Sequence, residues 1–175
     1  PERSLAHARR ADQAQDRRLA LGIELAHREI FEDAPLDLVE PEVILGIATA
    51  GVIPGVVVAS ILQVEFASMA VTRKDAGSEP ILVAGPPATI RGRRVLLVDE
   101  TCDTGSTFKL ALNEVRALKP KEVKTAASFK TGPYKPDYHA FETENLIILP
   151  WDREIIEGDQ LVMRPDYVKW LKGNS

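Results

Sequence analysis

The segment from Val95 to Thr107 constrains the fold of this 175-residue chain more than any other. It opens with four branched apolar residues in a row. A run without polar alternation is typical of a strand that is covered on both faces, as in the middle of a parallel sheet. Three acids and a short turn follow, and the turn leads into a predicted helix over residues 108–118. The pattern indicates an α/β protein that binds its ligand at the carboxyl end of this strand.

The turn after the acids has the chemistry of a phosphate site. A helix start offers backbone N–H groups that have no partner within the helix, and these stabilise an anion. Gly105 lets the backbone approach closely, and neighbouring hydroxyls add donors. The residues expected to hold a phosphate are Thr104, Gly105, Ser106 and Thr107. A Walker A loop needs Gly-Lys-Ser/Thr, and a dinucleotide fingerprint needs three spaced glycines; this segment has neither.

The acids are Asp99, Glu100 and Asp103. Carboxylates repel a phosphate, so their expected targets are sugar hydroxyls, a bridging Mg²⁺, or a proton that is removed during a reaction. A phosphorylated sugar would suit both parts of the segment, because its hydroxyls can contact the acids and its phosphate can bind the turn. The structural alternative is a buried strand followed by a helix that Asp103 or Thr104 caps.

This order of strand, acids and Thr-Gly turn resembles the phosphoribosyl-pyrophosphate (PRPP) signature of the type I phosphoribosyltransferases. A loop of small residues after an expected strand at 43–47 resembles the pyrophosphate loop of that family. The resemblance implies a cis peptide bond between Ala48 and Thr49, and substrate contacts from Ala48, Thr49, Ala50 and Gly51. Where Thr49 stands, purine enzymes commonly carry Arg or Lys, and the loop looks more like that of orotate enzymes. Arg73 and Lys74 are then expected to neutralise the pyrophosphate together with Mg²⁺.

The C-terminal half resembles xanthine-guanine and related 6-oxopurine phosphoribosyltransferases. The resemblance implies that Lys130 meets the 6-oxo group, that Leu146 covers the base and that Ile147 offers backbone groups to its edge. Leu146 replaces a residue that is usually aromatic, and it therefore loses base stacking worth about 1–3 kcal/mol in other nucleic-acid sites. The implied metal ligands are Asp99, Glu100 and Asp152.

The implied reaction is transfer of the 5-phosphoribosyl group from PRPP to a purine base in purine salvage, with Mg²⁺ as cofactor and Asp103 as the general base or hydrogen-bond partner of the purine. Two alternatives stay open. One is an orotate or other non-purine transferase, which Thr49 suggests. The other is a non-catalytic sensor of PRPP or nucleotides. Relatives are usually dimers or tetramers, so we expect a homodimer or homotetramer.

Length and composition favour a single domain over residues 1–175, because 45% apolar residues suffice for one core. A net charge of −4 gives no general attraction to nucleic acid or anionic membranes. Cys102, the one cysteine, cannot form an internal disulfide, and a packing or hydrogen-bonding role is expected for it. The apolar stretch at 52–62 is too short to span a bilayer, so a cytoplasmic location is expected.

The expected fold is a doubly wound parallel sheet flanked by helices, since strands and helices alternate along the chain. The first segment, 1–35, has apolar residues at helical spacing. Gly and Pro between 73 and 92 predict a flexible loop, with a short hairpin at 81–83. The remaining expected elements are strands at 66–71, 123–129 and 146–149 and helices at 54–62 and 165–171.

Overall fold

The computed structural model describes residues 40–74, 78–145 and 147–173. The predicted helical segment over 1–35 and the predicted base contact Leu146 lie outside this range. The chain divides into two compact units, the first ending at Thr143 and the second beginning at Glu144. The single domain over 1–175 stays a prediction.

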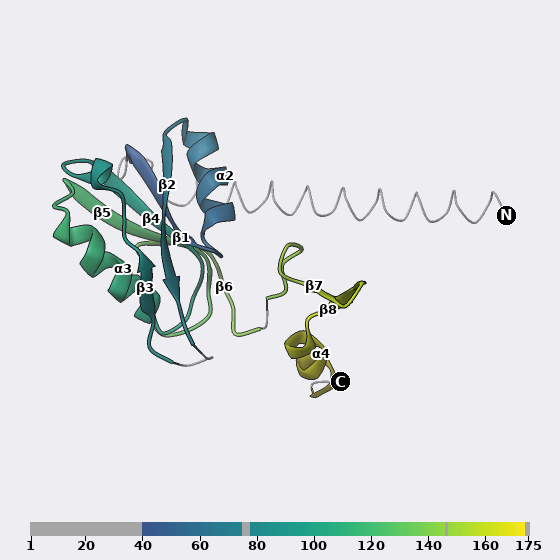
Figure 1. Ribbon diagram of the computed structural model, residues 1–175. Coiled ribbons are helices and arrows are strands. Elements are labelled where there is room, and N and C mark those ends of the chain that lie inside the picture. Colours follow the sequence, from purple (N-terminus) through teal and green to yellow (C-terminus); the bar gives the residue numbers. More distant parts are fainter. Residues whose placement is uncertain (1–39, 75–77, 146, 174–175) are drawn as a thin grey trace. The chain divides into compact units, whose positions relative to one another are not determined.

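Within the described residues, the first unit holds a six-stranded sheet of order β3-β2-β1-β4-β5-β6 (Figure 1). Its strands are β1 (Val43–Ala48), β2 (Glu65–Thr72), β3 (Ile81–Ala84), β4 (Arg94–Cys102), β5 (Glu122–Lys130) and β6 (Tyr138–Glu142). Neighbouring strands are parallel, except that β3 runs antiparallel to β2. Helices α2 (Val52–Leu62) and α3 (Ser106–Ala117) cover opposite faces (Figure 1). The predicted doubly wound α/β fold is confirmed.

The central strands are apolar on both faces because each face has a helix to cover. In β1, Val43, Leu45 and Ile47 belong to the core cluster that includes Phe108 of α3. Ile44, which points the other way, belongs to the cluster with Ala59 of α2 and with Leu96 and Val98 of β4. Successive residues of a strand face opposite sides of a sheet, so continuous apolar runs fill both clusters.

Two elements differ from the prediction. The sheet ends at β6, which the sequence did not indicate, whereas residues 147–149 form no strand. An edge strand needs less apolar surface than a central one, and β6, half-buried to exposed, carries mixed polar and apolar residues. The predicted loop over 73–92 contains β3, at the place where the short hairpin at 81–83 was predicted, and also the short 3₁₀ helix η1 (Ala88–Ile90), which was not predicted. Antiparallel pairing with β2 gives the short β3 its hydrogen bonds despite the surrounding prolines and glycines.

The second unit contains an antiparallel hairpin, β7 (Glu154–Glu157) and β8 (Gln160–Met163), followed by α4 (Pro165–Gly173). The predicted C-terminal helix is therefore confirmed. Asp152 accepts hydrogen bonds from Arg164 Nη1 and from the Tyr167 hydroxyl, and these tie the start of the hairpin to the helix. Within the described part of the chain, no helix combines the length and the apolar character required to cross a membrane.

Candidate active site

The sheet has a topological switch point between β1 and β4. These strands are parallel neighbours, but β1 connects through α2 to β2 on one side, while β4 connects through α3 to β5 on the other. The loops that leave their carboxyl ends therefore diverge, and ligands of open α/β sheets bind in the crevice that results. Both predicted phosphate-binding segments, 48–51 and 104–107, leave from these two strand ends.

The first of these loops packs directly on the acidic strand. The Ala48–Thr49 peptide bond is cis, as predicted, and Thr49 and Ala50 are exposed. Gly51 is buried, and a Cβ on it would lie 2.4 Å from the carbonyl oxygen of Val98 and 2.9 Å from Cα of Asp99. Only glycine allows this approach, so the loop lies beside the backbone of Asp99.

The second loop forms the start of α3. Gly105 precedes the helix with a φ of +72°, a left-handed conformation that favours glycine. The hydroxyls of Thr104 and Ser106 lie 3.1 Å apart. The hydroxyls, the glycine and the helix start on which the prediction of an anion site depends are thus together at this turn, and anion binding itself stays a prediction.

Arg73, at the end of β2, reaches this same turn. Its Nη2 donates to Ser106 Oγ at 2.5 Å and to Thr107 Oγ1 at 3.1 Å, while Nη1 donates to the carbonyl oxygen of Ser78 at 2.7 Å. The resemblance implied a pyrophosphate contact for Arg73, whereas the structure brings its guanidinium to the predicted phosphate turn. A guanidinium suits a phosphate because its donors match two oxygens at once.

Asp99 is a buried acid within β4, with 8% of its surface exposed, and its Oδ1 accepts a hydrogen bond from the Glu100 N–H at 2.8 Å. Burial raises the pKa of Asp99 to about 7, and the negative charge of Glu100 acts in the same direction. The Glu100 N–H and the charge of Arg73 partly offset this rise. Asp99 therefore changes protonation near neutral pH.

Asp99 and Glu100 are adjacent acids that the resemblance implies as ligands of Mg²⁺. Among the described residues, no group of three or more His, Cys, Asp or Glu side chains is arranged to hold a metal ion. Mg²⁺ commonly keeps several waters and takes one or two carboxylates together with substrate phosphates. Asp99 and Glu100 would be the carboxylates for a Mg²⁺ that arrives with a diphosphate substrate, and this role stays a prediction. Asp152 belongs to the second unit, so its role as a metal ligand stays a prediction.

Asp103 and Lys130 lie at the same end of the sheet. Strand register pairs Lys130 of β5 with Cys102 of β4, the residue before the exposed Asp103. Lys130 forms an ion pair with Glu142, its partner on β6, and this contact lowers the pKa of Glu142. The sequence reasoning missed Glu142 because it did not predict β6. A strand assignment at 138–142 would have revealed the pair.

Residues 12–157 match the family model of the phosphoribosyl transferase domain. This chain belongs to the phosphoribosyltransferase family. Among solved structures, this chain resembles a purine phosphoribosyltransferase from Pyrococcus horikoshii, with 31% identity and a TM-score of 0.65. That match covers 78% of this chain and 94% of the other.

Curated relatives match a smaller part of this chain. Phosphoribosyltransferase domain-containing protein 1 of Xenopus laevis is 30% identical over 95 residues, which are 50% of this chain and 42% of that protein. Human hypoxanthine-guanine phosphoribosyltransferase is 37% identical over 67 residues, which are 35% of this chain and 31% of that protein. The chain thus spans less than half the length of these curated relatives.

Three other predicted residues have positions that bear on their roles. Cys102 is buried, and its burial, with the charges of Asp99 and Asp103, raises the pKa of the thiol to about 11. Cys102 belongs to the buried core cluster that includes Phe108, so it packs in the core as expected. Lys74 is exposed, and Ile147 is a half-buried residue of the second unit, so their substrate contacts stay predictions.

The connection from β5 to β6 is a part of the site that the sequence did not reveal. Tyr134 packs on the phosphate turn so closely that a Cβ on Gly105 would lie 2.1 Å from its ring. The Tyr134 ring also stacks on Phe108 with centroids 6.0 Å apart, and Lys109 Nζ lies 5.8 Å from its centroid. The phosphate turn therefore packs against a residue nearly 30 positions away in the sequence.

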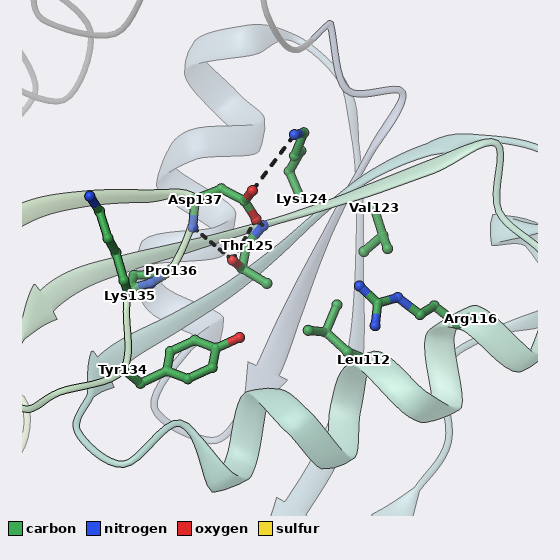
Figure 2. Close-up of a pocket in the computed structure, with 9 residues that line it drawn as sticks. All are labelled: Leu112, Arg116, Val123, Lys124, Thr125, Tyr134, Lys135, Pro136 and Asp137. Atoms are coloured by element: carbon green, nitrogen blue, oxygen red, sulfur yellow. Dashed lines mark hydrogen bonds and ion pairs between the residues drawn. The ribbon is translucent and has the colours of Figure 1, made fainter.

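Tyr134 also lines a pocket of about 540 Å³ between α3 and the connection to β6, and Figure 2 shows its hydroxyl directed toward the interior. Asp137 accepts hydrogen bonds there from Thr125 N and Oγ1, at 2.8 and 2.7 Å, and lies 3.6 Å from Lys124 Nζ. None of the predicted substrate-binding residues lines this pocket. Tyr134 is the residue that this pocket shares with the packing of the phosphate turn.

Proposed function

We propose that this protein transfers the 5-phosphoribosyl group from PRPP to a purine base, giving a nucleoside 5′-monophosphate and pyrophosphate. The observation that carries the proposal is the packing of Gly51 against Val98 and Asp99, because it holds the first predicted phosphate-binding loop against the strand that leads into the second, at the switch point. One loop then suits the 5′-phosphate of PRPP and the other its diphosphate.

In the proposed reaction, a ring nitrogen of the purine attacks the anomeric carbon of PRPP. A carbon–nitrogen bond forms while the bond to the pyrophosphate oxygen breaks, and its electron pair leaves with pyrophosphate. The transition state is expected to resemble an oxocarbenium ion, as in other substitutions at an anomeric carbon. Asp103 accepts the proton of the attacking imidazole ring. Asp99 and Glu100 orient the ribose hydroxyls, so the reacting atoms are aligned before the bond changes occur.

Mg²⁺ bound with the diphosphate would neutralise the charge that develops on pyrophosphate. Asp99 and Glu100 are the residues that would hold it. Arg73 contributes positive charge at the phosphate turn, where its Nη2 already contacts two hydroxyls. Thr49, Ala50 and the neighbouring backbone surround the diphosphate in this proposal.

The choice of a purine is supported by Lys130, which the strand register places one position from the loop that carries Asp103. An ammonium group there can donate to an exocyclic oxygen of a 6-oxopurine. Glu142 limits where that ammonium group lies. The names of the relatives from humans and Pyrococcus horikoshii point to purines as well. In this proposal the enzyme works in purine salvage in the cytoplasm, as a homodimer or homotetramer.

An orotate phosphoribosyltransferase is the second candidate, because Thr49 stands where purine enzymes commonly carry a basic residue. The experiment that decides between them supplies PRPP, Mg²⁺ and one base at a time: hypoxanthine, guanine, xanthine, adenine or orotate. Pyrophosphate release and nucleotide formation are measured. Release with a purine supports the proposal, and release with orotate alone replaces it. Binding of PRPP without turnover of any base would indicate a sensor.

A further inference from the structure

We infer that Gly132 is a positioning residue for Asp103. This inference rests on the proposed function, in which Asp103 accepts the proton of the base. Gly132 lies in the short connection that follows Lys130 at the end of β5. A Cβ on Gly132 would lie 1.9 Å from Asp103 Oδ1, and 2.8 Å from both the carbonyl carbon and the carbonyl oxygen of Asp103. The Asp103 carboxylate thus occupies the space that a side chain at 132 would fill.

Backbone freedom does not explain this glycine. The positive-φ glycines in the described residues are Gly92, Gly105 and Gly158, and Gly132 is not one of them. An alanine at 132 can therefore adopt the same backbone conformation, and what it changes is the space beside Asp103. Close approach of one loop to another is the remaining reason for glycine at this position.

Two hydrogen bonds hold this connection against the backbone of Cys102 and Asp103. The Thr131 N–H donates to the carbonyl oxygen of Cys102 at 2.8 Å, and the Tyr134 N–H donates to the carbonyl oxygen of Asp103 at 3.2 Å. Gly132 lies between these two anchors, so it cannot move away from Asp103 without breaking one of them. Tyr134, whose N–H forms the second anchor, covers Gly105 of the phosphate turn with its ring.

The connection therefore links β5, the strand that carries Lys130, to Asp103, the acid that acts on the base in the proposed reaction. Lys130, which the resemblance assigns to the base, is two residues from Gly132 in the chain. A side chain at 132 would rotate the Asp103 carboxylate or push its backbone outward. Rotation of a carboxylate costs little stability, but a displacement of about 1 Å at a reacting group can lower a rate by about 100-fold.

The test compares Gly132→Ala with Gly85→Ala, a matched control at a glycine with no heavy atom within 4 Å of the added Cβ and no left-handed φ. We expect Gly132→Ala to lower kcat by about 100-fold with the KM for PRPP changed by less than about threefold, and Gly85→Ala to change neither. The same substitution in an Asp103→Asn background should lower kcat by less than about twofold, because the residue it displaces no longer acts as a base. Equal losses in both backgrounds would overturn the inference.

Thermal unfolding supplies a readout that does not depend on activity. Asp103→Ala removes Oδ1, so Gly132→Ala should lower Tm less in the Asp103→Ala background than in the wild type. If Gly132→Ala alone does not fold, the double variant should; failure of both to fold would overturn the inference. An inactive wild type would refute the proposed function. An active wild type whose Gly132→Ala variant matches Gly85→Ala would refute only the role of Gly132.

Discussion

Asp99 should make the metal-free protein less stable as the pH rises through the weakly acidic range. This carboxyl is buried in β4, and its pKa is about 7 instead of 3.8. The native state therefore holds a proton on Asp99 at pH values where the unfolded chain has released it. The unfolding free energy falls with pH wherever the native state binds more protons than the unfolded state. The stabilising contribution of the Asp99 carboxyl to the unfolding free energy is fully present below about pH 4 and is lost by about pH 7.

The size of the effect follows from the two pKa values. One pH unit corresponds to about 1.4 kcal/mol, so the whole window of about 3 units is worth about 4 kcal/mol. Between about pH 5 and about pH 8, where few other carboxyls titrate, the loss is about 3 kcal/mol. Asp99→Asn abolishes it, because an amide of nearly the same shape does not titrate. The variant should gain about 3 kcal/mol relative to wild type over this interval.

Urea unfolding in EDTA at a series of pH values measures this difference directly. Asp159→Asn, at an exposed acid in the turn of the second unit, is the control and should follow the wild type across the whole range. If the unfolding free energies of wild type and Asp99→Asn change in parallel with pH, burial does not raise the pKa of Asp99, and the reasoning is wrong.

Three further substitutions test other parts of the site. Asp103→Asn should lower kcat by about 10²–10⁴-fold while calorimetry still detects PRPP binding, and unchanged turnover would remove Asp103 from the role of base. Arg73→Gln should weaken PRPP binding by about 10- to 100-fold, since a hydrogen bond to a charged group is worth about 1.5–3 kcal/mol. Arg91→Gln, at an exposed arginine beyond the other end of β4, serves as the control. Equal affinities of the two variants for PRPP would contradict the phosphate contact of Arg73. Gly105→Ala and Gly92→Ala both place alanine at a φ near +70°, but only residue 105 meets the Tyr134 ring. Denaturant unfolding should show Gly105→Ala to be less stable than Gly92→Ala by about 1–3 kcal/mol, and equal losses would show that the ring moves aside freely.

The central part of the fold could be predicted because its signals are local. The apolar run at Val95–Val98 indicates a strand covered on both faces, whatever the neighbouring strands are. The cis bond at Ala48–Thr49 was predicted from the resemblance of its loop, and it is present. β6 could not be predicted in this way, because its residues are ordinary for an exposed segment and only pairing with β5 makes them a strand.

For the candidate site too, the local features were predicted and the contacts between distant residues were not. The sequence identified Asp99, Asp103 and the phosphate turn, since these residues are close together in the chain and their types suit a phosphorylated sugar. It did not identify Glu142 beside Lys130, nor the contact of Arg73 with Ser106. The first contact joins residues 12 positions apart and the second joins residues 33 positions apart, and a local sequence pattern does not predict contacts over such separations.

The sequence by itself determined the layered α/β fold and the chemical types at the two strand ends, because hydrophobic runs and turn residues act on their immediate neighbours. Only the tertiary structure decided which groups meet. It placed Gly51 on the backbone of Asp99, buried that carboxyl enough to raise its pKa, and set Gly132 against Asp103. Close approach and desolvation arise when segments distant in the chain exclude water together, so they depend on the packed fold.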